Sequence, residues 1–307
     1  MELEDPKFET IEKYQEYLKE RQELLGYCKK ISQGIDNLDE KSGERAIWEL
    51  VQNARDMDED CRIRIELDED GIVFAHHGKP FDYLSLLALV NQNSSKDNPG
   101  ANLVGQYGTG FMTTHAFNEI VTINGPYKAM ANPTTLKGYV ELGDFKLNRS
   151  FKDTEEAIEE MRTEMRIVAE MHKKTPLHES LDRWTTFSYN LGSTQLADVS
   201  SQLASAIRLM PMVLVINERI KEVEVHDRYA KRHFKIQNDN NSDKVSFRKD
   251  GSWIKVTNQI STTDLTTGLM STDSIISLQS QDGEDVILLP PYPVYNNRKV
   301  SQIIIEK

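Results

Sequence analysis

The sequence contains little cysteine and no long apolar run. Its 307 residues include only Cys28 and Cys61, so a framework of disulfide bonds is excluded and a reducing cytoplasm is expected. No uninterrupted apolar stretch approaches the ~20 residues that a membrane-spanning helix needs. The acidic start, MELEDPKFET, lacks the apolar core of a secretory signal. These absences predict a cytoplasmic protein with no membrane partner.

Positive charge is also scarce. Lys and Arg number 37 against 49 Asp and Glu, which gives a formal net charge of −12. A field of that sign repels DNA, RNA and anionic membranes, so direct nucleic-acid binding by this segment is not expected. Apolar residues make up 38% of the chain, which is enough to bury a core. At roughly 100–200 residues per domain, the length predicts two domains.

Hydrophobic periodicity predicts an α+β fold. Helices are expected at 7–32, 43–58, 81–90, 108–117, 151–174 and 194–210. Strands are expected at 61–67, 72–76, 119–125, 137–143, 184–191, 212–217 and 220–227, with further short strands after 233. A change from helices to short strands near 192–196 predicts domains at 1–195 and 196–307. The apolar ending VSQIIIEK favours a second domain that continues in a longer protein.

Polar residues that could bind a metal ion or act as a base lie on the second expected helix. Glu49, Asn53 and Asp56 are spaced i, i+4 and i+7, so they share one face of the helix. A carboxylate and an amide oxygen on one face suit a hard divalent cation and a water that needs deprotonating. The alternative is an ordinary solvated polar face.

A second feature, HHGKPF, follows the expected strand at 72–76. Gly78 at the end of a strand lets the backbone approach a ligand closely. His76 and His77 are adjacent on the strand and point to opposite faces, so we do not expect them to bind one metal ion together. The alternative is a plain junction between a strand and a helix.

The third feature is the glycine-rich run GQYGTGF at 105–111, which follows a long polar loop. Long loops without regular structure in compact domains are usually functional. Three glycines at the start of a helix suit backbone N–H groups that converge on an anion such as a phosphate. The run is not a Walker A loop, because no Lys-Ser or Lys-Thr follows its last glycine, and its spacing differs from the Rossmann fingerprint.

The three features in this order resemble the Bergerat-fold ATPases of the GHKL superfamily, over about residues 40–191. ELVQNARD is similar to the ELISNASD motif of the HtpG-type chaperone branch, and GQYGTGF is similar to its GQFGVGF motif. SSK at 94–96 is similar to the SGTK stretch, and TTFSYNL is similar to the T-x-I/L-x-L strand. The resemblance implies a Bergerat-type α/β sandwich followed by a smaller, strand-rich, transducer-like domain.

The resemblance also implies residue roles with ATP and Mg²⁺ as cofactors. Glu49 corresponds to the general base that activates the attacking water, and Asn53 to the Mg²⁺ ligand. Residues 91–109 correspond to a lid, and Thr185 to the threonine of the adenine site. The implied nucleotide-binding residues are Asn53, Asp56, His76, Gly78, Lys96, Gly105, Gln106, Tyr107, Gly108, Thr109, Gly110, Phe111 and Thr185.

The middle motif departs from the family pattern Asp-x-Gly-x-Gly. His76 stands where the family has the Asp that accepts a hydrogen bond from the adenine amino group, and Pro80 replaces the second glycine. The pattern HxGxPF resembles sacsin-type members. The basic residue that completes such sites comes from the second domain, where Lys255 and Lys299 are the candidates.

The expected function is slow Mg²⁺-dependent ATP hydrolysis, with lid closure driving a conformational change in a larger protein. The implied partners are ATP and ADP, a second copy bound in a nucleotide-dependent homodimer, and protein clients or downstream domains. One alternative is a nucleotide sensor that does not hydrolyse ATP. Another is the ATPase part of a MutL-like or topoisomerase-like effector, and a third is a structural protein with coincidental motifs. A histidine kinase is disfavoured, because no dimerisation helix pair with a phospho-acceptor histidine precedes the motifs.

Overall fold

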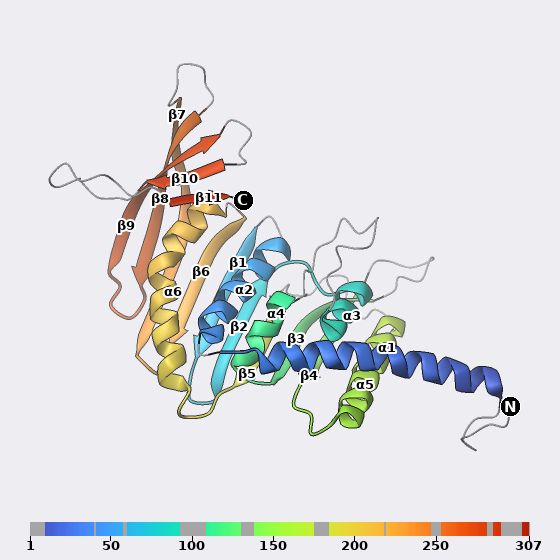
Figure 1. The fold of residues 1–307 in the computed structure, drawn as a ribbon. Helices are drawn as coiled ribbons and strands as arrows, with labels where there is room; N and C mark the ends of the chain where they lie inside the picture. The colour runs from blue at the N-terminus through green and yellow to red at the C-terminus, as the bar shows by residue number, and fades with distance from the viewer. Residues whose placement is uncertain are drawn as a thin grey trace. The chain divides into compact units, whose positions relative to one another are not determined.

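The computed structural model is a mixed α+β protein, which confirms the predicted fold class (Figure 1). It describes residues 10–39, 41–57, 60–92, 109–129, 138–174, 184–217, 219–246, 253–280, 285–289 and 303–306. The chain divides into two compact units. Unit 1 comprises 1–56 and 79–191, and unit 2 comprises 57–78 and 192–307. The hairpin at 57–78 therefore groups with the C-terminal part of the chain, and the predicted domains at 1–195 and 196–307 stay a prediction.

Unit 1 combines helices with a three-stranded antiparallel sheet. Its helices are α1 (Ile11–Asp36), α2 (Ser42–Met57), α3 (Tyr83–Asn91), α4 (Thr109–Met112) and α5 (Thr154–Lys173), and a 3₁₀ turn (Thr113–Ala116) follows α4. Its strands are β3 (Ile120–Lys128), β4 (Tyr139–Asn148) and β5 (Trp184–Asn190). The strand order is β5-β3-β4. These elements agree with the predicted ones to within a few residues.

Side-chain caps fix where the helices of unit 1 begin. Thr10 accepts a hydrogen bond from the Lys13 amide and starts α1. Asp82 and Ser85 form a reciprocal capping box at the start of α3. Asp153 accepts from the Glu156 amide at the start of α5. Such caps satisfy N–H groups that have no partner inside the helix.

Helices α1 and α5 pack against each other in unit 1, as Figure 1 shows. The Cys28 Sγ and Met161 Sδ atoms lie 3.4 Å apart in this buried contact. At the surface, Arg162 bonds to Glu20 at 2.9 Å, and Arg21 pairs with Glu155. Apolar contact in the interior therefore stabilises the pair, with exposed ion pairs at its rim that contribute little.

Arg149 is a buried junction between three elements of unit 1. Its guanidinium lies 2.9 Å from both carboxylate oxygens of Glu164 on α5, and the two side chains are 0% and 2% exposed. The same group donates to the Val90 carbonyl oxygen in the last turn of α3 at 2.9 Å, and to the Asn148 carbonyl oxygen of β4 at 2.6 Å. One buried cation thus fixes α3, β4 and α5 to one another.

In the part of unit 2 that the structure describes, a sheet is accompanied by one long helix. Its helix is α6 (Leu196–Ile216), and its strands are β1 (Cys61–Leu67), β2 (Gly71–His77), β6 (Ile220–Asp227), β7 (Arg232–Ser246), β8 (Trp253–Asp264), β9 (Met270–Ser280), β10 (Asp285–Leu289) and β11 (Ile303–Glu306). The order is β11-β10-β9-β8-β7-β6-β1-β2. Only β1 and β6 pair in parallel among these described strands, and the predicted β1–β2 hairpin is confirmed.

The prediction of a strand at 212–217 is wrong, because α6 continues to Ile216. MVLVI is rich in β-branched residues, which favour strands locally. Met210, Leu214 and Val215 are buried at helical spacing, so packing against the sheet decides the conformation. By length and hydropathy α6 could also cross a membrane, a test that the core helix of a water-soluble protein passes as well.

Candidate functional site

The motif helix α2 forms as predicted and presents its polar residues on one side. Its apolar face is buried and consists of Ala46, Ile47, Leu50, Val51 and Ala54. Glu49, Asn53 and Asp56 are half-buried. The three polar side chains therefore lie at the boundary between the core and solvent, where a ligand can reach them.

The first and third motifs meet in unit 1. A Cβ atom built at Gly110, in the first turn of α4, would overlap Oε2 of Glu49 and lie only 2.8 Å from its Cδ. Real Cβ atoms essentially never approach other atoms that closely. The backbone of the glycine-rich motif thus rests directly on the carboxylate of the motif helix, 61 positions earlier in the chain (110 − 49).

The ionisation of Glu49 depends on two opposing influences. The pKa of its carboxyl group is raised above the ordinary value, because burial raises it by more than the positive charge of Arg45 lowers it. Arg45 precedes Glu49 by four positions on α2, and its guanidinium donates to Ser42 Oγ at 3.0 Å and lies 3.5 Å from Asp39 Oδ1. Arg45 is a residue that the sequence analysis did not single out, although its i, i+4 spacing from Glu49 was a readable signal.

Two other predicted residues in unit 1 have a buried polar atom without a hydrogen-bond partner among the described residues. These atoms are Nδ2 of Asn53 and Oγ1 of Thr185, and Thr185 is only 1% exposed. Leaving such a group unpaired costs about 1–3 kcal/mol. Unpaired polar atoms on two of the predicted residues are therefore consistent with a ligand that supplies the missing partners.

Thr185, on β5, lies close against the neighbouring strand β3. This close approach is possible because Gly125, on β3, has no side chain. A Cβ at Gly125 would lie 2.9 Å from Oγ1 and 3.0 Å from Cα of Thr185. Gly125 also has a φ of +151°, which side chains rarely adopt, and a register shift between β3 and β4 occurs at this point. Gly125 is not among the residues predicted for the site, although a glycine inside an apolar strand often marks a close approach.

Residues 76–78 of the middle motif belong to unit 2, and residues 79–81 belong to unit 1. His76 is 2% exposed, and burial, followed by repulsion from His77, lowers the pKa of its imidazole to about 4. Its ring is therefore neutral near pH 7. His77 is half-buried where His76 is buried, as expected for adjacent residues on a strand. Gly78 follows directly after β2, as predicted.

The structure describes some of the remaining predicted residues and not others. Phe111 is fully buried and contacts the Phe187 ring at a centroid distance of 5.8 Å. Lys255 lies on β8. Outside the described residues lie Lys96, Gly105, Gln106, Tyr107, Gly108 and Lys299, most of the lid at 91–109, and the side chain of Thr109. In the described part of the chain, no three His, Cys, Asp or Glu residues are grouped as metal ligands.

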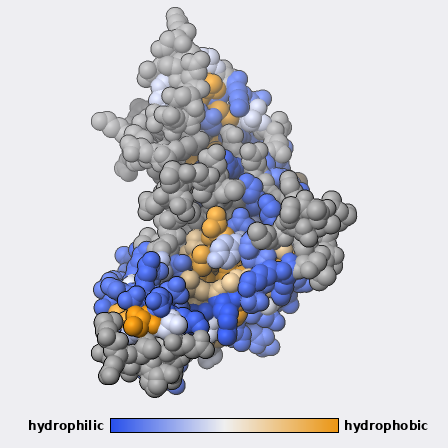
Figure 2. Space-filling view, turned by 90° about the vertical axis from the view of Figure 1, so that its right-hand side faces the viewer, coloured by the Kyte–Doolittle hydropathy of each residue, from blue (hydrophilic) through white to orange (hydrophobic). Residues whose placement is uncertain are grey.

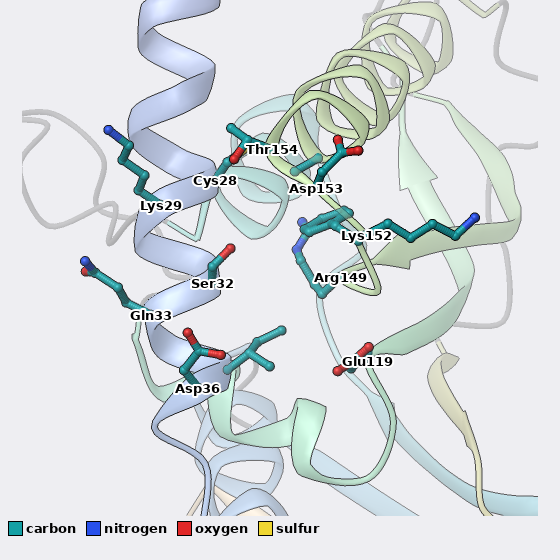
Figure 3. Close-up of a pocket in the computed structure, with 13 residues that line it drawn as sticks. Cys28, Lys29, Ser32, Gln33, Asp36, Glu119, Arg149, Lys152, Asp153 and Thr154 are labelled. Atoms are coloured by element: carbon teal, nitrogen blue, oxygen red, sulfur yellow. The ribbon is translucent and has the colours of Figure 1, made fainter.

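A cavity of about 420 Å³ lies elsewhere in unit 1, between α1 and the start of α5 (Figure 3). Ser32 of α1 faces Arg149 across it, whereas the ammonium group of Lys152 points away. None of the predicted site residues lines this cavity.

Figure 2 shows mainly hydrophilic residues, with a hydrophobic area near the centre of the view. Among the described large apolar residues, Leu84 of α3 is one of the most exposed, at 62%.

Comparisons with known proteins give a distant structural likeness. The sequence matches no protein-family model and no curated protein. A solved structure with a similar arrangement is the B subunit of DNA gyrase from Myxococcus xanthus, at a TM-score of 0.35 and 10% sequence identity. The match covers 70% of this chain and 60% of that chain. This chain therefore spans less than two thirds of the gyrase subunit that it is similar to.

Proposed function

We propose that this chain binds ATP with Mg²⁺ and hydrolyses it slowly, with Glu49 as the general base. One observation carries the proposal, namely the contact between Gly110 and the Glu49 carboxylate. A phosphate-binding backbone and a base for water must lie side by side in a site that hydrolyses a nucleoside triphosphate. The two motifs that the GHKL resemblance assigns to these roles do so in unit 1.

The residues present fit the two cofactors. Asn53 is the residue that would hold Mg²⁺, through its side-chain oxygen, and its unpaired Nδ2 leaves a donor for a neighbouring acceptor on the ligand. Thr185 has an unpaired hydroxyl group, which can donate to or accept from a base. When bound, Mg²⁺ neutralises phosphate charge and usually keeps several waters.

The residues of the proposed site have different parts in the reaction. Glu49 accepts a proton from the water that attacks the terminal phosphate, and a positioned general base typically contributes ~10²–10⁴-fold to the rate. Gly110 lets the backbone lie against that carboxylate. Asp56, His76, Gly78 and the residues of 105–111 retain the nucleotide-binding roles that the resemblance implies.

At the scale of the whole protein, we propose a chaperone-like ATPase module in the cytoplasm. Its binding and hydrolysis cycle would drive a conformational change in a larger protein, through a nucleotide-dependent homodimer and through protein clients or downstream domains. The HtpG-like and sacsin-like motifs support this branch of the superfamily. A MutL-like or topoisomerase-like effector would use the same site, and the net charge of −12 disfavours DNA contact by this segment.

The test compares turnover and affinity in matched variants. Glu49→Ala is expected to abolish most turnover and leave the calorimetric affinity for Mg·ATP nearly unchanged, because other groups hold the phosphates. Glu44→Ala removes an exposed carboxylate from the same helix and should behave as wild type. Zero turnover and equal affinity in wild type and Glu49→Ala would identify a sensor instead. Normal turnover by Glu49→Ala would reject Glu49 as the base.

A further inference from the structure

We propose that the stacked side chains of His226 and His233 act as a pH-sensitive latch that holds helix α6 to the sheet of unit 2. The histidine stack lies on one face of the sheet. The hydrogen bonds that hold α6 lie on the other face, at the next residue pair of the β6–β7 ladder. The inference goes beyond the proposed ATP hydrolysis and does not depend on it, because all of these residues belong to unit 2.

On one face of the sheet, a buried cluster of polar groups joins α6 to β6 and β7. Helix α6 packs against both strands (Figure 1). Asp227 of β6 is 0% exposed, and its Oδ2 accepts hydrogen bonds from Ser200 Oγ of α6 and from the Arg232 guanidinium of β7, both at 2.7 Å. The same nitrogen of Arg232 donates to the Ser200 carbonyl oxygen at 2.9 Å. These bonds fix the first half of α6 to the point where β6 ends and β7 begins.

On the other face, two imidazole rings lie one above the other. His226 directly precedes Asp227, and His233 directly follows Arg232, so both histidines point away from α6. The two histidines are paired in the ladder, and their rings are stacked with centroids 4.2 Å apart and 14° between the ring planes. Nearly parallel rings direct their lone pairs into separate planes. The geometry therefore suits stacking and does not suit chelation of one metal ion.

The stack can hold one proton more easily than two. Glu224 Oε1 lies 2.7 Å from His233 Nε2, so one imidazolium ring has a carboxylate partner. A second proton would place two positive rings with their centroids 4.2 Å apart, and charges at that separation repel each other. Full protonation therefore opposes the stacked arrangement.

Neighbouring charges do not remove this repulsion. The charged residues that face the stack are Arg64 and Glu66 of β1, Glu224 of β6, Arg228 of the following turn and Lys235 of β7. Glu66 bonds to Arg228 at 3.3 Å, Glu224 lies 3.6 Å from Arg64, and Lys235 pairs with Glu222 at 2.8 Å. On the other side of β7, the uncharged Leu265 donates its amide to the His233 carbonyl oxygen at 2.7 Å. Each carboxylate near the stack thus already has a cationic partner.

The pKa of His226 agrees with this geometry. Burial, followed by the charges of His233 and Arg228, lowers the pKa of its imidazole by more than Glu66 and Glu224 raise it. A group of this kind stays neutral in the folded state while the unfolded state takes up a proton, so stability is lost as the pH falls below the ordinary value of 6.5. The stack is therefore intact at neutral pH and weakened in acid.

Weakening the stack affects α6 because the two layers share one ladder. When both rings are charged they separate, and the strands that carry them move apart at the neighbouring pair, Asp227 and Arg232. The bonds of this pair to Ser200 are then strained or broken. The hold on α6 is thus firm at neutral pH and loosens as the pH falls below about 6.5.

Hydrogen exchange of the α6 amides, corrected for the intrinsic effect of pH, measures the latch. Between about pH 7 and about pH 5, local opening of α6 should increase roughly threefold more in wild type than in His226→Gln, because partly exposed charges interact modestly. His233→Gln removes the same repulsion from the other strand and should match His226→Gln, so the test does not depend on one variant folding. His172→Gln removes a histidine from α5 of unit 1 and should keep the wild-type response. Equal responses in wild type and both stack variants would overturn the inference.

A titration of the His226 ring tests the repulsion separately. Its imidazole ¹³C signal, identified by its loss in His226→Gln, is followed against pH in wild type and in His233→Gln. A midpoint at higher pH in His233→Gln supports the stack as the source of the effect, because the like charge is gone. Coincident curves reject it. Neither measurement uses ATP, so a failure of the proposed hydrolysis would leave both results able to decide the role of the stack.

Discussion

At the scale of single residues, the site depends on two glycines that permit close approaches. Gly110 admits the Glu49 carboxylate, and Gly125 admits Thr185. Both contacts join residues that are distant in the sequence. At both positions the neighbouring functional group occupies the space that a Cβ would take, so a side chain there requires that group to shift.

Gly110→Ala tests the first of these contacts. The new methyl group must displace the Glu49 carboxylate, and a misplacement of about 1 Å can cost ~10² in rate. We therefore expect turnover to fall by a factor of roughly 10–100, while the melting temperature changes little, because alanine favours the helix. Turnover assays and thermal melts check both parts. Gly26→Ala, where nothing lies within 4 Å of the new Cβ, is the matched control.

Thr185→Val tests the unpaired hydroxyl group. Valine keeps the shape and removes a buried oxygen that has no partner among the described residues. The free energy of unfolding without nucleotide should stay the same or rise by up to about 1 kcal/mol. ATP affinity should fall by roughly tenfold if the hydroxyl group binds the nucleotide. Denaturant titration and calorimetry measure the two effects, and an unchanged affinity would remove Thr185 from the site.

At the scale of secondary-structure elements, unit 1 is fixed by a buried ion pair as well as by apolar packing. Arg149 and Glu164 join β4 to α5, and Arg149 also bonds to the Val90 carbonyl oxygen at the end of α3. A buried pair stabilises only weakly against an apolar replacement, but losing one partner leaves a charge without compensation. The arrangement therefore specifies how these elements meet more than it adds stability.

Removing one partner should be far more damaging than removing both. Glu164→Leu alone should lower the free energy of unfolding by about 3–5 kcal/mol, because Arg149 remains buried without a counter-ion. The double variant Arg149→Met, Glu164→Leu should recover most of that loss. Chemical denaturation of the two single variants and the double variant measures the coupling. Additive losses in the double variant would show that the ion pair is not the source of the effect.

At the scale of the whole molecule, the proposed activity requires that ligand binding stabilise the folded chain. Anything that binds only the native state raises its stability, by about 2.7 kcal/mol at a ligand concentration of 100 times Kd. Mg·ATP should therefore raise the melting temperature in a concentration-dependent way. EDTA should reverse most of this rise, because the phosphates then lack their cation.

Asn53→Ala provides the matched variant for this prediction. It should melt near the wild-type temperature without ligand and gain little from Mg·ATP, because the proposed metal ligand is absent. Differential scanning fluorimetry with ATP, Mg²⁺ and EDTA separates the cases. A wild-type response from Asn53→Ala would exclude this residue as the Mg²⁺ ligand, and no response from wild type would exclude ATP as the ligand.

Local patterns in the sequence determined the fold class, most helix and strand positions, the β1–β2 hairpin and the side of α2 that carries Glu49 and Asn53. These features follow from periodicity and turn chemistry, which act over a few residues. The contacts of Gly110 with Glu49 and of Gly125 with Thr185 were decided by tertiary structure, as was the helical conformation of 212–217. They depend on which distant segments share the same space, and burial there outweighs local propensity.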